Sequence, residues 1–154
     1  MSTGIYYTRD MERDRKSFFF NGFGILASLF ILLSGKIIPT AGVDILVQVF
    51  GLLLIIWSLI TIKVSKHYHN LPQGYFFINH GPYEILRHPV YAGYLLIAIS
   101  IVEIDFSFLR LIALLILCLC IMFKVIREEF MMTQEIKEYK EYKVKTKALI
   151  PYLL

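Results

Sequence analysis

Residues that can bind an anion are concentrated in a short segment directly before an apolar run. The segment reads Gly-Pro-Tyr-Glu-Ile-Leu-Arg-His-Pro-Val-Tyr-Ala-Gly over residues 81–93. Its two prolines, Pro82 and Pro89, stiffen the backbone, because the residue before each proline is pushed away from helical geometry. Pro89 can occupy the first turn of a helix, where its missing N–H costs nothing. We expect the free N–H groups of that helix, beside Arg87 and His88, to attract a carboxylate or a phosphate.

A second group of charged residues follows the last apolar run. Lys124 and Glu128 are four residues apart, which makes them neighbours on one face of a helix. Glu129 adds a second carboxylate. Two adjacent carboxylates close to a membrane face suit a cationic ligand, and Lys124 can orient an anionic one. The alternative interpretation is an ordinary solvated helix end, and we expect Tyr139 and Tyr142 beyond it to be interface anchors.

The histidines do not predict a metal site. His67 and His69 are two residues apart, the spacing of a metal pair on a strand, but no strand is expected there and no cluster of Cys or carboxylates accompanies them. We interpret them as interfacial residues. His88 differs because it lies beside Arg87 and Tyr91 in the proline-bounded segment, where it either binds a ligand or anchors the loop.

The elements that must position these residues are membrane helices. Apolar residues make up 57% of the 154 residues and charged residues only 18%, with a mean hydropathy of +0.63. A soluble domain of this size has too little interior to bury so much apolar surface. We therefore predict an all-α integral membrane protein that forms a single domain over residues 1–154. Four transmembrane helices are expected, at about residues 18–39, 43–62, 90–104 and 106–125.

Polar residues are concentrated in a loop over about 63–89 and in the tail. The tail mixes Glu and Lys at helical spacings with an apolar face, which predicts a C-terminal amphipathic helix at about 128–147. Only Lys36 and Arg110, among the 16 lysines and arginines, fall outside the N-terminal arm, the loop and the C-terminal region. By the positive-inside rule, both termini and the loop are expected in the cytoplasm of a multi-pass protein. These flanks account for the basic pI without a nucleic-acid partner.

Together, the 81–93 segment and the tail resemble the isoprenylcysteine carboxyl methyltransferase family. The segment is similar to that family's G-x-Y…R-H-P-x-Y-x-G signature. The tail follows the order of a second family motif, with Glu128-Glu129, Met132, Tyr139…Tyr142 and Ile150-Pro151. The resemblance covers about half of the chain, from Tyr75 to Pro151, while the N-terminal half is similar only in having two predicted spans.

This resemblance implies a membrane-embedded enzyme, a methyltransferase that uses S-adenosylmethionine without a Rossmann domain. Its acceptor would be lipophilic and would arrive from the bilayer, so membrane lipids are the expected partners, with no nucleic acid and no metal. Lys124 and Arg87 are the candidate catalytic residues. Carried over from the family, the cofactor-binding residues are Tyr75, Phe76, Phe77, Ile78, Tyr83, His88, Pro89, Val90, Tyr91 and Glu128. Aromatic faces and a carboxylate suit the cationic ammonium and sulfonium of that cofactor.

Two departures from the family pattern leave the acceptor open. Lys124 stands where the family has an arginine that contacts the acceptor, and lysine lacks the bidentate fork that grips a carboxylate. Ile136-Lys137 replaces a Phe-Gly step, so the tail should turn differently. A prenylcysteine, an amine-headed phospholipid, a quinone-like lipid and a small thiol remain possible acceptors. A non-catalytic membrane module is a further alternative, while sterol reductases with a similar signature are much longer.

Overall fold

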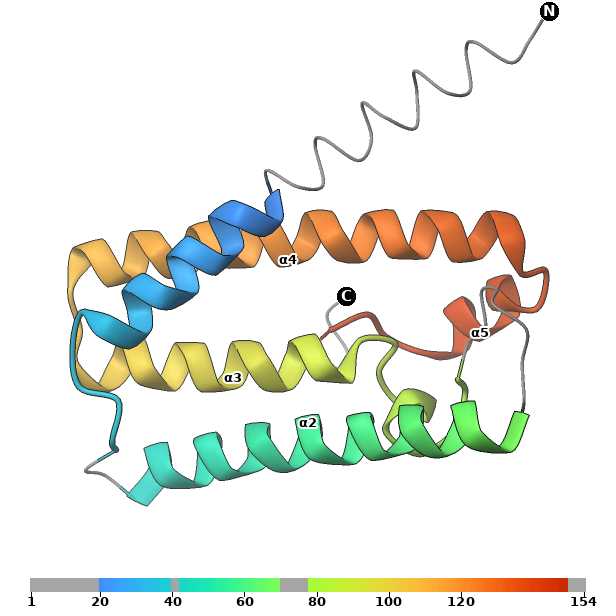
Figure 1. Cartoon of the computed structure of the whole chain (residues 1–154), viewed down its shortest axis with the longest axis horizontal. Coiled ribbons are helices and arrows are strands. Elements are labelled where there is room, and N and C mark those ends of the chain that lie inside the picture. Colours follow the sequence, from blue (N-terminus) through green and yellow to red (C-terminus); the bar gives the residue numbers. More distant parts are fainter. Residues whose placement is uncertain (1–19, 40–41, 70–77, 150–154) are drawn as a thin grey trace, which may run out of the picture.

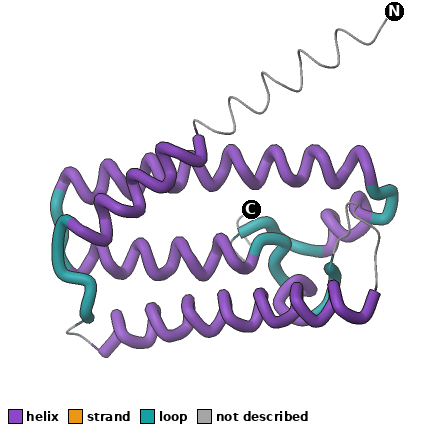
Figure 2. Tube along the Cα trace, viewed as in Figure 1, coloured by secondary structure: helices purple, strands orange, loops and turns teal. Residues whose placement is uncertain are grey.

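The computed structural model describes residues 20–39, 42–69 and 78–149, and helices dominate these ranges (Figures 1 and 2). No strand forms within them apart from an isolated parallel bridge between Leu86 and Lys147, which confirms the all-α prediction. In chain order the elements are an N-terminal helix (Phe20–Leu33), α2 (Gly42–His69), the 3-10 helix η1 (Gly81–Glu84), α3 (Pro89–Ile104), α4 (Phe108–Glu135) and α5 (Tyr139–Lys145).

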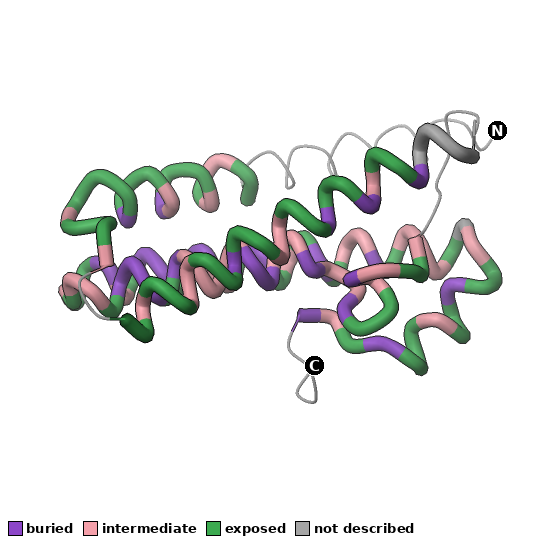
Figure 3. The backbone as a smooth tube through the Cα atoms, turned by 90° about the horizontal axis from the view of Figure 1, so that it is seen from below, coloured by how far each residue is buried: buried purple, intermediate pink, exposed green. Residues whose placement is uncertain are grey.

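Two of the helices are long enough and apolar enough to cross a bilayer, Gly42–Ser65 within α2 and Phe108–Gln134 within α4. The N-terminal helix and α3 are apolar but shorter. The 16 residues of α3 rise about 24 Å at roughly 1.5 Å per residue, less than the roughly 30 Å of hydrocarbon. Exposed residues run along the outer sides of the helices (Figure 3) and include large apolar side chains such as Leu46 and Leu53 of α2. Such a surface is typical of a membrane protein.

Helix α3 lies in the middle, packed between α2 and α4 (Figure 1). Against α2 the contact depends on two glycines: a Cβ built on Gly93 would lie 2.6 Å from the carbonyl oxygen of Gly51. Small residues at such crossings let membrane helices pack closely. On the opposite side, buried residues of α3 join one apolar core with the N-terminal helix and α4; this core includes Ile31, Ala98, Ile101, Val102, Leu114 and Leu117.

A buried arginine ties the end of the N-terminal helix to the turn between α3 and α4. Arg110 is 2% exposed, and it donates hydrogen bonds to the carbonyl oxygens of Asp105 (2.6 Å) and Ile31 (3.0 Å). The backbone N–H of Lys36 donates to Asp105 Oδ2 at 3.1 Å. In the described part of the chain the helix ends at Leu33, and the residues after it contact this cluster. The predicted first span, 18–39, is therefore too long as a helix.

The C-terminal region does not form the single amphipathic helix that was predicted at 128–147. Helix α4 continues to Glu135, Ile136 is extended (φ −124°, ψ 111°), and α5 folds back. The predicted loop at 63–89 begins as the last turns of α2 and contains η1. Its residues 70–77, which include the predicted cofactor-binding residues Tyr75, Phe76 and Phe77, lie outside the described residues.

Candidate functional site

The segment before α3 is held in place by the C-terminal tail. The N–H groups of Arg87 and His88 donate to the carbonyl oxygens of Lys147 (2.7 Å) and Ala148 (3.0 Å), and the N–H of Lys147 donates to Ile85 (3.2 Å). Pro89 then occupies the first position of α3, as predicted, with His88 as the N-cap residue. Two neighbouring side chains, Arg87 and His88, are thereby fixed at the start of a helix.

Arg87 links the start of α3 to α4 and α5. Its Nε donates to Glu129 Oε1 at 2.6 Å, and its Nη1 donates to the carbonyl oxygens of Lys143 (3.0 Å) and Thr146. Lys143 Nζ lies 2.7 Å from the other oxygen of Glu129. Both side chains of the Arg87–Glu129 pair are 8% exposed. These contacts hold the start of α3 against α4 and α5, and the catalytic role of Arg87 stays a prediction.

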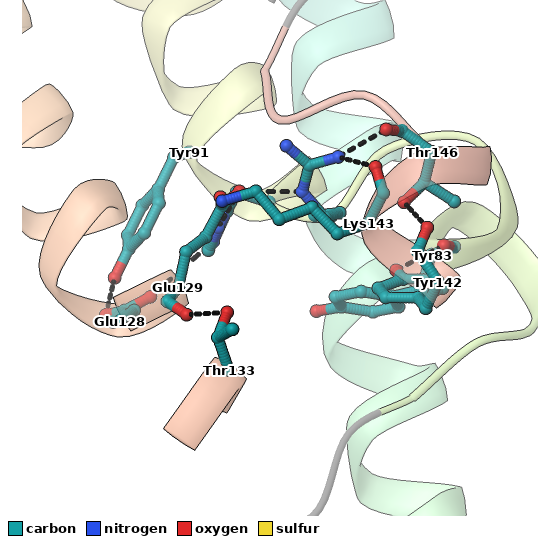
Figure 4. A network of polar contacts seen from close by, with 10 residues as sticks. Tyr83, Tyr91, Glu128, Glu129, Thr133, Tyr142, Lys143 and Thr146 are labelled. Carbon is teal, nitrogen blue, oxygen red and sulfur yellow. Dashed lines mark hydrogen bonds and ion pairs between the residues drawn. The ribbon is translucent and has the colours of Figure 1, made fainter. Parts of the chain in front are cut away.

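Glu128 occupies a different environment from its neighbour Glu129. The hydroxyl of Tyr91 donates to Glu128 Oε1 at 2.7 Å (Figure 4). His88 Nδ1 lies 3.5 Å from Glu128 Oε2, and the rings of His88 and Tyr91 are stacked with centroids 5.7 Å apart. The Glu128 side chain is 35% exposed. This carboxylate is therefore accessible to a ligand, while Tyr91 and His88 limit its orientation.

A cavity of about 410 Å³, called the His88 cavity below, opens between α2, η1, α3, α4 and α5. The predicted site residues that line it are Ile78, Tyr83, Arg87, His88, Val90, Tyr91 and Glu128. Pro89 is buried and does not line the cavity. The other lining residues are Leu59, Ile62, Met132, Tyr139 and Tyr142. The cavity thus combines aromatic and apolar walls with one accessible carboxylate.

Tyr139 and Tyr142 were expected at the membrane interface, yet both line the His88 cavity. Their Y-x-x-Y spacing within the second motif is the signal that could have identified them. Tyr142 also donates a hydrogen bond from its hydroxyl to the carbonyl oxygen of Tyr83. Burial, with a smaller effect of the Glu128 carboxylate, raises the pKa of Tyr83 to about 12, and burial raises the pKa of Tyr142 to about 12. Both phenols are therefore neutral at physiological pH.

Lys124, the other candidate catalytic residue, does not line the His88 cavity. It lines a neighbouring cavity of about 470 Å³ between the N-terminal helix, α3 and α4, called the Lys124 cavity below. Its Nζ lies 5.3 Å from the centroid of the Tyr91 ring. Tyr91 lines both cavities. The structure therefore brings Lys124 next to Tyr91, one of the predicted cofactor-binding residues. Among the described lining residues, Tyr91 is the one that the two cavities share.

A family model described as phospholipid methyltransferase matches residues 40–139. The match runs from the start of α2 to the start of α5 and includes Tyr83, Arg87, His88, Tyr91, Lys124, Glu128 and Glu129. Neither the curated proteins nor the solved structures give a match to the chain.

Proposed function

Because the chain belongs to the phospholipid methyltransferase family, we propose that it transfers a methyl group from S-adenosylmethionine to the amine headgroup of a membrane phospholipid. The methyl donor would bind in the His88 cavity. The observation that carries the proposal is the gathering of Tyr83, His88, Tyr91 and Glu128 around one cavity beside two membrane-length helices. Among the acceptors that the sequence left open, the amine-headed phospholipid is the class that the description of the matched family supports.

The residues of the His88 cavity fit the donor in volume and in chemistry. Its volume of about 410 Å³ lies within the range of small-molecule sites, roughly 300–1,000 Å³. The accessible Glu128 carboxylate and the neutral Tyr83 ring suit the donor's ammonium and sulfonium. Apolar side chains such as Ile62 and Met132 suit an adenine ring. The N–H groups at the start of α3, after Pro89, suit the donor's carboxylate.

Bound donor would supply a methyl group on a positively charged sulfur. In the transfer, the lone pair of the neutral acceptor amine forms an N–C bond while the C–S bond breaks and its electron pair stays on sulfur, leaving a methylated ammonium and a neutral thioether. The amine must be deprotonated before it attacks, and its proton leaves to water. The protein's contribution is alignment of the two reactants and exclusion of water. The buried Arg87–Glu129 pair serves this alignment because it fixes α4 and α5 around the cavity.

The test is a methyl-transfer assay on the purified full chain in vesicles. Protein would be added to phosphatidylcholine vesicles that contain phosphatidylethanolamine, with S-adenosylmethionine labelled in its methyl group. We expect label in the ethanolamine lipid and none in the absence of that lipid. Label that enters an isoprenylcysteine analogue but not the ethanolamine lipid would overturn the proposed acceptor. Absence of donor binding by the purified protein would overturn the proposed methyltransferase activity.

We also propose that the end of the molecule that carries α5 faces the cytoplasm, together with both termini. The basic residues support this orientation, because the end with more lysines and arginines usually faces the cytoplasm. Lys140, Lys143 and Lys145 lie in α5, whereas Arg110 lies at the other end, at the start of α4. In a variant without Cys118 and Cys120, a single cysteine replacing exposed Phe106 should react with a membrane-impermeant thiol reagent in intact cells. A cysteine replacing Lys140 should react only after permeabilisation. The reverse labelling pattern would overturn the orientation.

A further inference from the structure

The outward side of α5 has the features of a docking surface for the membrane itself. We propose that Lys140, Val144 and Lys147, called the outer face below, bind the anionic phospholipid headgroups of the surrounding bilayer. The inference goes beyond the proposed function, because it assigns a partner to a surface that lies outside the His88 cavity and the Lys124 cavity. It holds whether or not the chain transfers a methyl group.

The first argument is the way in which α5 divides its residues between two sides. Tyr139 is 4% exposed, and it lines the His88 cavity together with Tyr142. Lys140 and Val144 are both exposed, and their spacing of four residues places them together on another side of the helix. Lys147 is exposed just after the helix, and Val144 is 87% exposed. The outer face therefore offers two cations around an aliphatic side chain, a combination that suits the headgroup region of a bilayer.

The second argument is that the carboxylates near α5 gather on a side that the outer face does not share. They line a polar cavity of about 330 Å³ between η1 and α5, with Lys145 among them: Glu84, Glu138 and Glu141. Lys140 and Lys147 do not line this cavity. Among the residues that the structure describes, neither of these two lysines forms an ion pair with a carboxylate. Their charge is therefore available to an external anion, whereas Lys145 shares its cavity with three carboxylates.

The third argument is the position of the outer face along the bundle. Figure 1 shows α5 at the end of the molecule where α2 and α4 end, with the tail running back from it toward the start of α3. Two residues after Lys147, Leu149 lines an apolar cavity of about 790 Å³ between α2 and α3, which Trp57 also lines. None of the described residues that line it is charged, as expected at hydrocarbon depth, and tryptophan is enriched at the edge of that region. Lys147 therefore lies close to the level of the lipid phosphates.

An anionic bilayer surface is the partner that this chemistry fits. Lysines near such a surface are attracted to it, and the attraction falls off within a Debye length, about 8 Å at physiological salt. A zwitterionic surface offers phosphates but no net charge. The proposed orientation also puts α5 on the cytoplasmic side, where the leaflet carries anionic lipids. Docking there would hold Tyr139 and Tyr142 against the His88 cavity, since they occupy another side of the same short helix.

Two lysines of α5 provide a matched test. Lys140 and Lys145 are both exposed, and both lie within the helix. Lys140→Gln removes a charge from the outer face, while Lys145→Gln removes the same charge beside the carboxylates of the polar cavity. Neither residue lines the His88 cavity or the Lys124 cavity. A difference between the two variants therefore reports the position of the charge and not the net charge of the protein.

The experiment uses the full chain in phosphatidylcholine nanodiscs to which phosphatidylglycerol is added in increasing proportion. A fluorophore is attached through Val144→Cys in a variant without Cys118 and Cys120, and a nitroxide on the phosphatidylcholine headgroup quenches it. We expect stronger quenching as phosphatidylglycerol is added, and loss of this increase in concentrated salt. Lys140→Gln should weaken the docking equilibrium roughly fivefold, the effect of one lysine at an anionic surface. Lys145→Gln should match the protein that keeps both lysines.

Hydrogen exchange of the unlabelled parent gives a second measurement, which decides if the labelled variant does not fold. The amides of α5 should exchange more slowly when phosphatidylglycerol is present, because docking stabilises the helix.

Unchanged quenching and unchanged exchange on addition of phosphatidylglycerol would overturn the inference, as would an equal loss of docking in Lys140→Gln and Lys145→Gln. Slower exchange caused by soluble poly-glutamate but not by phosphatidylglycerol would assign the outer face to an acidic protein instead. Neither measurement uses the methyl donor or turnover, so failure of the docking surface and failure of the proposed function are distinguishable.

Discussion

Glu128 and Glu129 are adjacent in the sequence, and His88 lies 3.5 Å from both carboxylates, but their other partners differ. Glu129 lies 2.6 Å from Arg87 Nε and 2.7 Å from Lys143 Nζ, whereas Glu128 accepts a hydrogen bond from the Tyr91 hydroxyl at 2.7 Å. Two cations of the protein balance Glu129, while Glu128 keeps its charge available beside the His88 cavity. Substitutions at the two positions should therefore affect different properties.

If the donor binds in the His88 cavity as proposed, Glu128→Gln should weaken its binding, because this change keeps the shape of the side chain and removes the charge offered to the donor's cationic groups. The expected loss is about 1–3 kcal/mol, the usual scale of a charge-assisted contact. Equilibrium binding of S-adenosylmethionine to the purified protein measures it. Glu103→Gln is the control, since Glu103 is exposed on α3 and does not line the cavity. Equal donor affinity of Glu128→Gln and the parent would remove Glu128 from the site.

Arg87→Met should lower stability, because it leaves the Glu129 carboxylate buried and without its closest partner. Breaking a buried ion pair in this way costs about 3–5 kcal/mol, measurable as the free energy of unfolding in detergent. Lys143→Met should cost less than about 1 kcal/mol, since the Lys143 side chain is 46% exposed. A folded Arg87→Met variant of parental stability that has lost turnover would instead support the catalytic role predicted from the sequence.

Gly93→Ala should destabilise the contact between α2 and α3, because the added Cβ would lie 2.6 Å from the Gly51 carbonyl oxygen. Overpacking of this kind costs about 1–3 kcal/mol, partly offset by the better helix propensity of alanine. We expect a lower Tm in detergent. Gly22→Ala is the matched control, with open space around its Cβ, and should leave the Tm equal or higher. A Tm for Gly93→Ala at or above that of the control would show that the helices adjust at no cost.

Lys124 tests the identity of the acceptor. If the acceptor is an amine-headed phospholipid, Lys124→Arg should keep about the activity of the parent on that lipid, because either side chain carries a positive charge for the phosphate. Lys124→Met should raise KM for the lipid several-fold and leave donor affinity unchanged, since Lys124 does not line the His88 cavity. Steady-state kinetics in mixed vesicles measure both effects. Faster methylation of an isoprenylcysteine analogue by Lys124→Arg than by the parent would favour a carboxylate acceptor.

The sequence predicted those parts of the fold that depend on local patterns. The apolar runs placed α3 close to its observed bounds and the start of α2 within one residue, although α2 continues to His69 and not to 62. The proline-bounded segment placed Pro89 at the first position of α3. The resemblance to known motifs selected Tyr83 and Glu128, which the structure brings to one cavity. These features follow from residue type and spacing along a short stretch of chain, which a sequence displays directly.

The features that sequence reasoning missed depend on contacts between distant segments. The N-terminal helix ends early where Arg110, far along the chain, binds the carbonyl oxygen of Ile31. The fold-back of α5 depends on the extended Ile136, and it brings Lys143 to Glu129. Spacing alone could not show that one of two adjacent glutamates would be neutralised by a residue from another helix.

The pairing of the segment before α3 with the tail has a consequence for biosynthesis. Arg87 and His88 leave the ribosome well before Lys147 and Ala148, whose carbonyl oxygens hold their N–H groups. The His88 cavity therefore cannot reach its final form while α2 and α3 are first inserted into the membrane. Nascent chains that stop before residue 148 should contain the helices but lack the complete cavity and, with it, the proposed donor binding. Helix insertion and completion of the cavity are therefore separate events in the biosynthesis of this protein.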